Sequence, residues 1–144
     1  MRMATRAGNR TPAQLFALAF GVVYLAVGIV GIFVTKGFGN FAHEHTANYD
    51  KTLLIFHLNP LHNIVHIVLG LVWIGAAGRH SAAAGVNTLF GVVLLLVFVL
   101  GLFDLHFLAI DGAGDPDNYL HLATGLLAVY FGTAGAAGPG TART

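Results

Sequence analysis

The sequence of 144 residues is 56% hydrophobic and only 9% charged, with a formal net charge of +1. Soluble domains carry about 25% charged residues, so this chain lacks the charge to cover a water-exposed surface and belongs to the membrane class. The near-neutral balance argues against a nucleic-acid partner, and the absence of cysteine excludes disulfides, thiolate metal sites and a cysteine nucleophile.

Four apolar segments follow one another along the chain, each close to the ~20 residues that a helix needs to cross a bilayer. The first is longer than the ~7–15 apolar residues of a signal-peptide core, so we expect it to be retained. Because a helix satisfies its own backbone hydrogen bonds in lipid, the prediction is one all-α domain over residues 1–144, an integral membrane four-helix bundle. The expected helices span about residues 12–34, 60–77, 82–103 and 119–137.

Lys and Arg residues are unequally distributed between the two ends of this expected bundle. One end holds Arg2, Arg6, Arg10, Arg79 and Arg143, whereas the loops at the other end hold only Lys36 and Lys51. The positive-inside rule therefore predicts a multi-pass protein of the cell membrane with both termini in the cytoplasm. Residues 79–81 are then expected inside, and residues 104–118 outside.

The stretch "FHLNPLHNIVHIVLGL" (residues 56–71) brings polar side chains to the outer end of the second expected helix. Asn59 is a favoured N-cap residue, and Pro60 suits the first helical position. Steps of three and four residues place Asn59, His62 and His66 on one helical stripe. Lipid disfavours these side chains, so the stripe should face the interior of the bundle.

A second stretch echoes the first. "NYLHLATGLLAV" at 118–129 is similar to "NPLHNIVHIVLG" at 59–70, which pairs Asn118 with Asn59 and His121 with His62. We therefore expect His62 and His121 at similar depth, with Gly70 and Gly125 allowing the second and fourth helices to approach each other. Asp115–Pro116 offers a competing start for the fourth helix.

These two stretches, together with the early "GVVYLAVGIVGIF", resemble the domain-of-unknown-function family 4383, which consists of small four-helix bacterial membrane proteins. The resemblance covers nearly the whole chain in the same order. It implies the fold and the membrane location, but it implies no activity and no catalytic residue.

Two interpretations of the polar residues remain open. In the structural one, a hydrogen-bonded cluster locks the helices together; its members are Asn59, His62, Asn63, His66, Asn118 and His121. In the other, a metal ion is bound by His62, His66 and His121, with Asp104 or His106 as a further ligand, or a haem is held by histidines of two helices. Asn63 stands where an H-E-x-x-H protease has its glutamate base, so zinc proteolysis is not expected.

The expected function depends on which of these two interpretations holds. The first hypothesis is a non-enzymatic accessory or partner-binding membrane module with a structural cluster, and the alternative is a metal- or haem-binding membrane protein. Histidine-based pH sensing and transport are further alternatives. The expected partners are the lipid bilayer and another membrane protein or a second copy of this chain, with no nucleic acid.

Overall fold

The computed structural model describes residues 9–37, 52–103, 108–110 and 112–136, and it is mostly helical. Its four α-helices are α1 (Pro12–Val34), α2 (Pro60–Ala76), α3 (His80–Gly101) and α4 (Pro116–Gly132). Two short antiparallel strands precede α2, and a 3-10 turn precedes α4: β1 (Thr52–Leu53), β2 (Phe56–His57) and η2 (Gly112–Gly114). The expectation of an all-α chain with four helices is confirmed for these ranges.

Capping side chains set where the helices begin. The hydroxyl of Thr11 and the side chain of Gln14 form a capping box at the start of α1, and Asn59 Oδ1 accepts a hydrogen bond from the backbone N–H of His62 at 2.8 Å. In α4 the cap is Asp115, whose Oδ1 accepts from the N–H of Asp117 at 2.9 Å. The expected range of 119–137 for the fourth helix is therefore wrong, because Asp115 and Pro116 start the helix one turn earlier.

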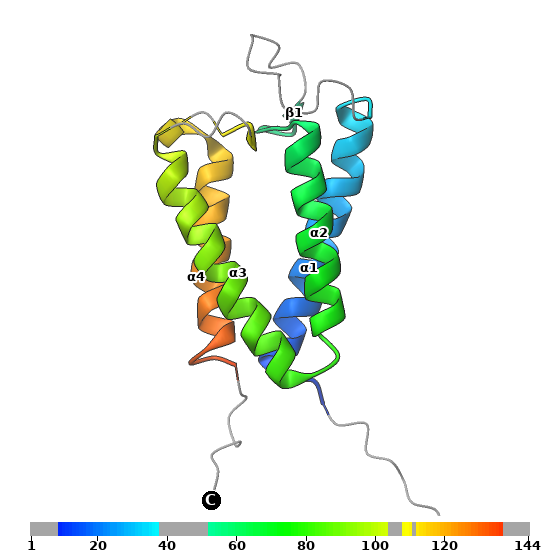
Figure 1. Cartoon of the computed structure of the whole chain (residues 1–144), viewed down its shortest axis with the longest axis vertical. Helices are drawn as coiled ribbons and strands as arrows, with labels where there is room; N and C mark the ends of the chain where they lie inside the picture. Colours follow the sequence, from blue (N-terminus) through cyan, green and yellow to red (C-terminus); the bar gives the residue numbers. More distant parts are fainter. Residues whose placement is uncertain (1–8, 38–51, 104–107, 111, 137–144) are drawn as a thin grey trace, which may run out of the picture.

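The helices form two hairpins that lie side by side, α1 with α2 and α3 with α4 (Figure 1). The start of α1, the α2–α3 connection and the end of α4 lie at one end, which we call the base. There the N–H of Ala13 donates to the carbonyl oxygen of Ala136 at 3.3 Å. The strands and η2 lie at the opposite end, which we call the top (Figure 1).

Glycines mark the closest approach within each hairpin. A Cβ atom added at Gly70 would lie 2.5 Å from the backbone N of Leu25 and 2.8 Å from the carbonyl oxygen of Gly21. At Gly125 it would lie 3.1 Å from the carbonyl oxygen of Gly91. The expectation that Gly70 and Gly125 bring α2 and α4 together is therefore wrong, since each glycine packs against the preceding helix of its own hairpin.

The two hairpins share one sequence pattern. "GVVYLAVGIVG" (21–31) in α1 corresponds to "GVVLLLVFVLG" (91–101) in α3, and "NIVHIVLG" (63–70) in α2 corresponds to "NYLHLATG" (118–125) in α4. The packing follows this register, because Oδ1 of Asn63 lies against Gly31 and Oδ1 of Asn118 lies against Gly101. The equivalent of His121 is therefore His66 and not His62, which corrects the pairing expected from the sequence.

The outer surface of the bundle is apolar, and several polar side chains are buried beside its apolar core. Large apolar side chains are exposed on the outward faces of all four helices, among them Leu15, Val22, Val68, Leu71, Leu89, Leu96, Leu126 and Tyr130. Polar side chains occupy buried positions between the helices, including Asn63, Asn87, Asp117 and Asn118. Two helices, α1 and α3, are long and apolar enough to cross a membrane.

One buried side chain joins all four helices near the base. Asn87 of α3 accepts a hydrogen bond from Nε1 of Trp73 in α2 at 3.0 Å. Its Nδ2 donates to the carbonyl oxygens of Ala13 in α1 and Phe131 in α4, at 3.0 and 3.4 Å. This residue therefore fixes the base of the bundle.

Replacing Asn87 with alanine should lower the free energy of unfolding by about 1–3 kcal/mol, because the buried N–H of Trp73 loses its acceptor. Unfolding of detergent-solubilised protein in SDS, followed by Trp73 fluorescence, measures the effect. Thr133→Ala is the matched control, because the exposed Thr133 hydroxyl donates to the carbonyl oxygen of Val129, one turn back in the same helix. A loss for Asn87→Ala no larger than that of the control would contradict this role.

Candidate metal site

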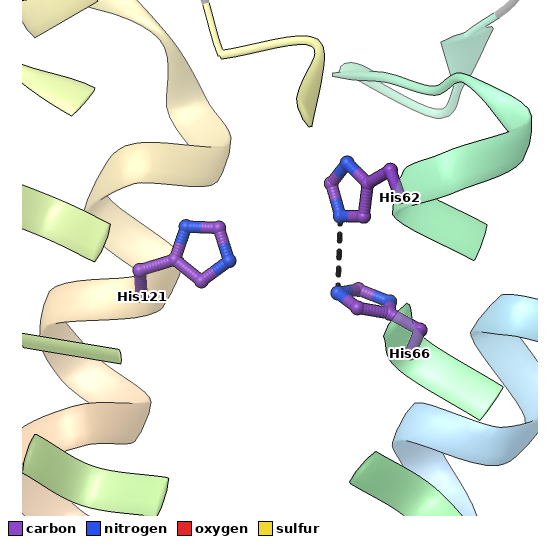
Figure 2. Close-up of side chains that lie close together, drawn as sticks. All are labelled: His62, His66 and His121. Carbon is purple, nitrogen blue, oxygen red and sulfur yellow. Dashed lines mark hydrogen bonds between the residues drawn. The ribbon is translucent and has the colours of Figure 1, made fainter. Parts of the chain in front are cut away.

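His62 and His66 are adjacent on the inner face of α2, one helical turn apart. Both side chains are buried, and their Nε2 atoms lie 3.0 Å apart (Figure 2). Nδ1 of His62 lies 2.9 Å from the carbonyl oxygen of Leu108. A carbonyl only accepts, so Nδ1 of His62 carries the proton, and in the neutral ring Nε2 keeps its lone pair for the cluster.

His121 approaches this pair from α4. Its ring lies across the interior of the bundle, at a level between His62 and His66, with one nitrogen facing them (Figure 2). One nitrogen from each of the three buried rings lies within 4.8 Å of the other two. The structure thus brings together the three histidines singled out in the sequence, and they come from both hairpins.

Asp117 is a fourth member that the sequence analysis missed. Its buried Oδ2 lies 3.5 Å from Nε2 of His62 and 3.7 Å from Nδ1 of His121, and it has no hydrogen-bond partner among the described residues. Once α4 begins at Pro116, Asp117 and His121 are four residues apart on one helical face. When the two hairpins are aligned by their shared sequence pattern, Asp117 corresponds to His62. The helix α2 therefore contributes the pair His62 and His66, and α4 contributes the pair Asp117 and His121.

The remaining members of the expected cluster have packing roles. Asn59 caps α2. Nδ2 of Asn63 donates to the hydroxyl of Thr35 at 3.2 Å, so this side chain is directed toward α1. Asn118 packs against Gly101 of α3. The three asparagines therefore stabilise the helix start and the two hairpins, whereas the histidines and Asp117 lie between the hairpins. Asp104 and His106, expected as further ligands, lie outside the described residues.

A cavity of about 70 Å³ adjoins the histidines. Its walls are apolar apart from the three rings, and comprise Val65, Leu69, Val93, Leu94, Val97 and Leu108. Space for one water needs about 10–15 Å³ by the same kind of measure, so the cavity has room for a few water molecules beside the rings.

The geometry defines a class: a helical chain of two equivalent hairpins that enclose a cluster of three imidazoles and one carboxylate beneath an apolar outer surface. A family model described as "Domain of unknown function (DUF4383)" matches residues 14–134, and the chain belongs to this family. The family resemblance seen in the sequence is thereby confirmed. Comparisons with curated proteins and with solved structures found no match.

Proposed function

We propose that this chain is a multi-pass membrane protein that binds one divalent transition-metal ion between its two hairpins. The large apolar side chains exposed on the outward faces of all four helices support the membrane part of this proposal. The helices α1 and α3 have 23 and 22 residues, and α2 and α4 have 17 each, which reaches the lower end of the range that spans a bilayer. Among the described residues, Arg10 and Arg79 lie at the base and Lys36 at the top, which supports a cytoplasmic location of both termini under the positive-inside rule.

The convergence of three buried imidazoles from two hairpins, with the Asp117 carboxylate beside them, supports the metal site. Zinc bound by nitrogen and oxygen at about 2.0–2.1 Å gives a tetrahedron with edges of about 3.3 Å. The separations of 3.0 Å between His62 and His66, and of 3.5 Å between His62 and Asp117, are close to this edge length. His121 offers a nitrogen within 4.8 Å of the ligand atoms of His62 and His66.

The groups around the ligands are those that metal-binding histidines use. The Leu108 carbonyl accepts the Nδ1 proton of His62 and so directs Nε2 of that ring to the ion. The carboxylate of Asp117 is buried, its Oδ2 has no hydrogen-bond partner in the described structure, and its nearest neighbours are ring nitrogens of His62 and His121 at 3.5 and 3.7 Å. A buried charge is costly when its pairing is incomplete. A divalent cation at this place neutralises that charge, which apolar packing alone does not.

The ligand set also indicates which ion and which role. Imidazole and carboxylate suit zinc, copper or iron. We favour a single ion over haem, because the three rings converge on one point and do not flank a slot for a macrocycle. The three histidines supply three ligands, and Asp117, 3.5 Å from Nε2 of His62, is the nearest carboxylate for the fourth tetrahedral position; the role we propose is non-enzymatic.

The structural cluster in a partner-binding module is the second candidate. The hydrogen bond between His62 and His66 favours it, since the metal-free pair already satisfies itself in part. Such bonds contribute about 0.6 kcal/mol on average in membranes.

Metal analysis of the purified protein separates the two candidates. After equilibration with zinc and removal of free metal, the unmodified chain should retain about one zinc ion, and the triple variant His62→Ala/His66→Ala/His121→Ala should retain less than about a tenth of that. His80→Ala is the control, because His80 lies at the base, hydrogen-bonded to Thr11. Equal, near-zero retention by all three proteins under zinc, copper and iron would overturn the metal proposal and leave the structural cluster.

A further inference from the structure

The aromatic ring of Tyr24 in α1 packs directly against His66 in α2. The two ring centroids lie 4.7 Å apart, the ring planes are tilted by 45°, and both side chains are buried. Tyr24 thus brings α1 into contact with the candidate metal site, whose histidines come from α2 and α4.

The orientation of His66 depends on such a packing contact more than the orientation of His62 does. Nδ1 of His62 lies 2.9 Å from the carbonyl oxygen of Leu108, which directs Nε2 of that ring to the cluster. Nδ1 of His66 is buried and has no hydrogen-bond partner in the described parts of the chain. The contact between the two Nε2 atoms is given up once both bind an ion. Neighbouring side chains must then hold the ring of His66.

Tyr24 is itself fixed on its other side. Its ring packs against Trp73 in a T-shaped arrangement, with the centroids 5.0 Å apart. Trp73 is fully buried and is anchored by the hydrogen bond from its Nε1 to Asn87 at 3.0 Å. Because protein interiors are closely packed, a ring held between Trp73 and His66 has little room to move. It can therefore keep the imidazole at a constant angle.

The second hairpin lacks this aromatic contact. The alignment of the two hairpins pairs His121 with His66, and it pairs Leu94 of α3 with Tyr24. Leu94 is buried and lines the cavity beside His121. The same position of the repeat thus holds an aromatic ring in one hairpin and an aliphatic side chain in the other, so leucine is compatible with the helix packing there.

We propose that Tyr24 is a positioning residue of the metal site, and that its ring holds the imidazole of His66 in the orientation that binds the ion. This role rests on the proposed function, because it requires a bound metal ion. An imidazole that is free to rotate loses that freedom when it binds, which weakens the affinity. A ring that restrains His66 before the ion arrives removes this cost.

The test measures zinc affinity by competition with a zinc-binding dye, in detergent-solubilised protein that SDS unfolding shows to be folded. Tyr24→Leu should bind zinc about tenfold more weakly than the unmodified chain, at the lower end of the 10–100-fold losses seen when a partner of a metal ligand is removed. Tyr24→Phe keeps the ring and should restore the affinity of the unmodified chain.

Phe20→Leu is the matched control for the loss of an aromatic ring. Phe20 lies one turn from Tyr24 on α1 and packs against Phe16 and Trp73, with centroid distances of 4.2 and 6.3 Å. This variant should lose core packing and should bind zinc as the unmodified chain does, because the ring that contacts His66 is still present.

Three outcomes would contradict the role of the ring. If Tyr24→Leu binds zinc as tightly as the unmodified chain, or no more weakly than Phe20→Leu, the ring does not position His66, and the metal site itself stands. An equal loss in Tyr24→Phe and Tyr24→Leu would assign the effect to the hydroxyl, which has no hydrogen-bond partner among the described residues. If the unmodified chain binds no zinc, copper or iron, the proposed function fails, and the role of Tyr24 fails with it.

Discussion

Replacing Gly70 with alanine is expected to destabilise the folded bundle by about 3 kcal/mol, although alanine is the better helix former. The added Cβ would meet the backbone N of Leu25 at 2.5 Å and the carbonyl oxygen of Gly21 at 2.8 Å. Backbone atoms of a packed helix cannot rotate away as a side chain can, so α1 and α2 must separate along their contact. Unfolding of the detergent-solubilised protein in SDS measures the loss.

The same helix offers a matched control for this substitution. A Cβ atom at Gly75 would have no other atom within 4 Å, so Gly75→Ala should stabilise α2 by up to about 1 kcal/mol. Gly125→Ala should fall between the two, because its closest neighbour is the side chain of Leu95, at 2.9 Å, which can adjust. Equal stabilities of the Gly70 and Gly75 variants would show that α1 and α2 do not approach as closely as described.

The number of helices and their approximate positions follow from the sequence, because continuous apolar runs of helical length have few other solutions. The starts of two helices follow from local chemistry, with Pro12 and Asn59–Pro60 acting as signals that need no tertiary information. The fourth start was placed too late, because the apolar run begins after Asp117 while the cap lies before it. The N-cap formed by Asp115 starts α4 at Pro116, although the first turn of the helix contains polar residues.

The neighbours of each helix were harder to infer. A sequence shows which residues share a helical face, but it does not show against which helix that face packs. The match of Asn59 and His62 with Asn118 and His121 was plausible by spacing alone. The register became apparent only from the packing, where Asn63 lies against Gly31 and Asn118 against Gly101. In the correct alignment of the two hairpins, His66 corresponds to His121.

Only part of the candidate site could be predicted from the sequence, because the sequence does not show how the helices pack. Two histidines at four-residue spacing on one apolar helix are visible in the sequence, and so is a third in the echoing stretch. Asp117 was not singled out because it lay in an expected loop, where a carboxylate needs no partner. Its burial depends on α4 starting at Pro116, one turn before His121, and on the packing of α4 in the bundle, and the packing is a tertiary outcome.

The substitution His66→Leu should separate the two candidate roles of the cluster, because a metal site predicts a large loss of zinc affinity with a small change in stability, and a structural cluster predicts the reverse. If the site binds an ion, His66→Leu removes one of its three histidine ligands, so zinc affinity should fall by more than about 100-fold, beyond the 10–100-fold typical of outer-shell changes. The stability of the metal-free chain should change by less than about 1 kcal/mol, because one membrane hydrogen bond is lost and apolar packing is gained. Competition with a zinc-binding dye measures the first quantity, and SDS unfolding with chelator measures the second.

The equivalence of the two hairpins adds a second test of the metal site. Because His121 is the equivalent of His66 in the other hairpin, His121→Leu should reduce zinc affinity by a similar factor, even though the two residues lie on different helices. Val65→Ala serves as the control, since Val65 lines the same cavity and offers no ligand atom. If His66→Leu instead destabilises the metal-free chain by several kcal/mol and leaves zinc retention unchanged, the cluster is a structural lock between the hairpins, and the carboxylate of Asp117 serves to orient His121.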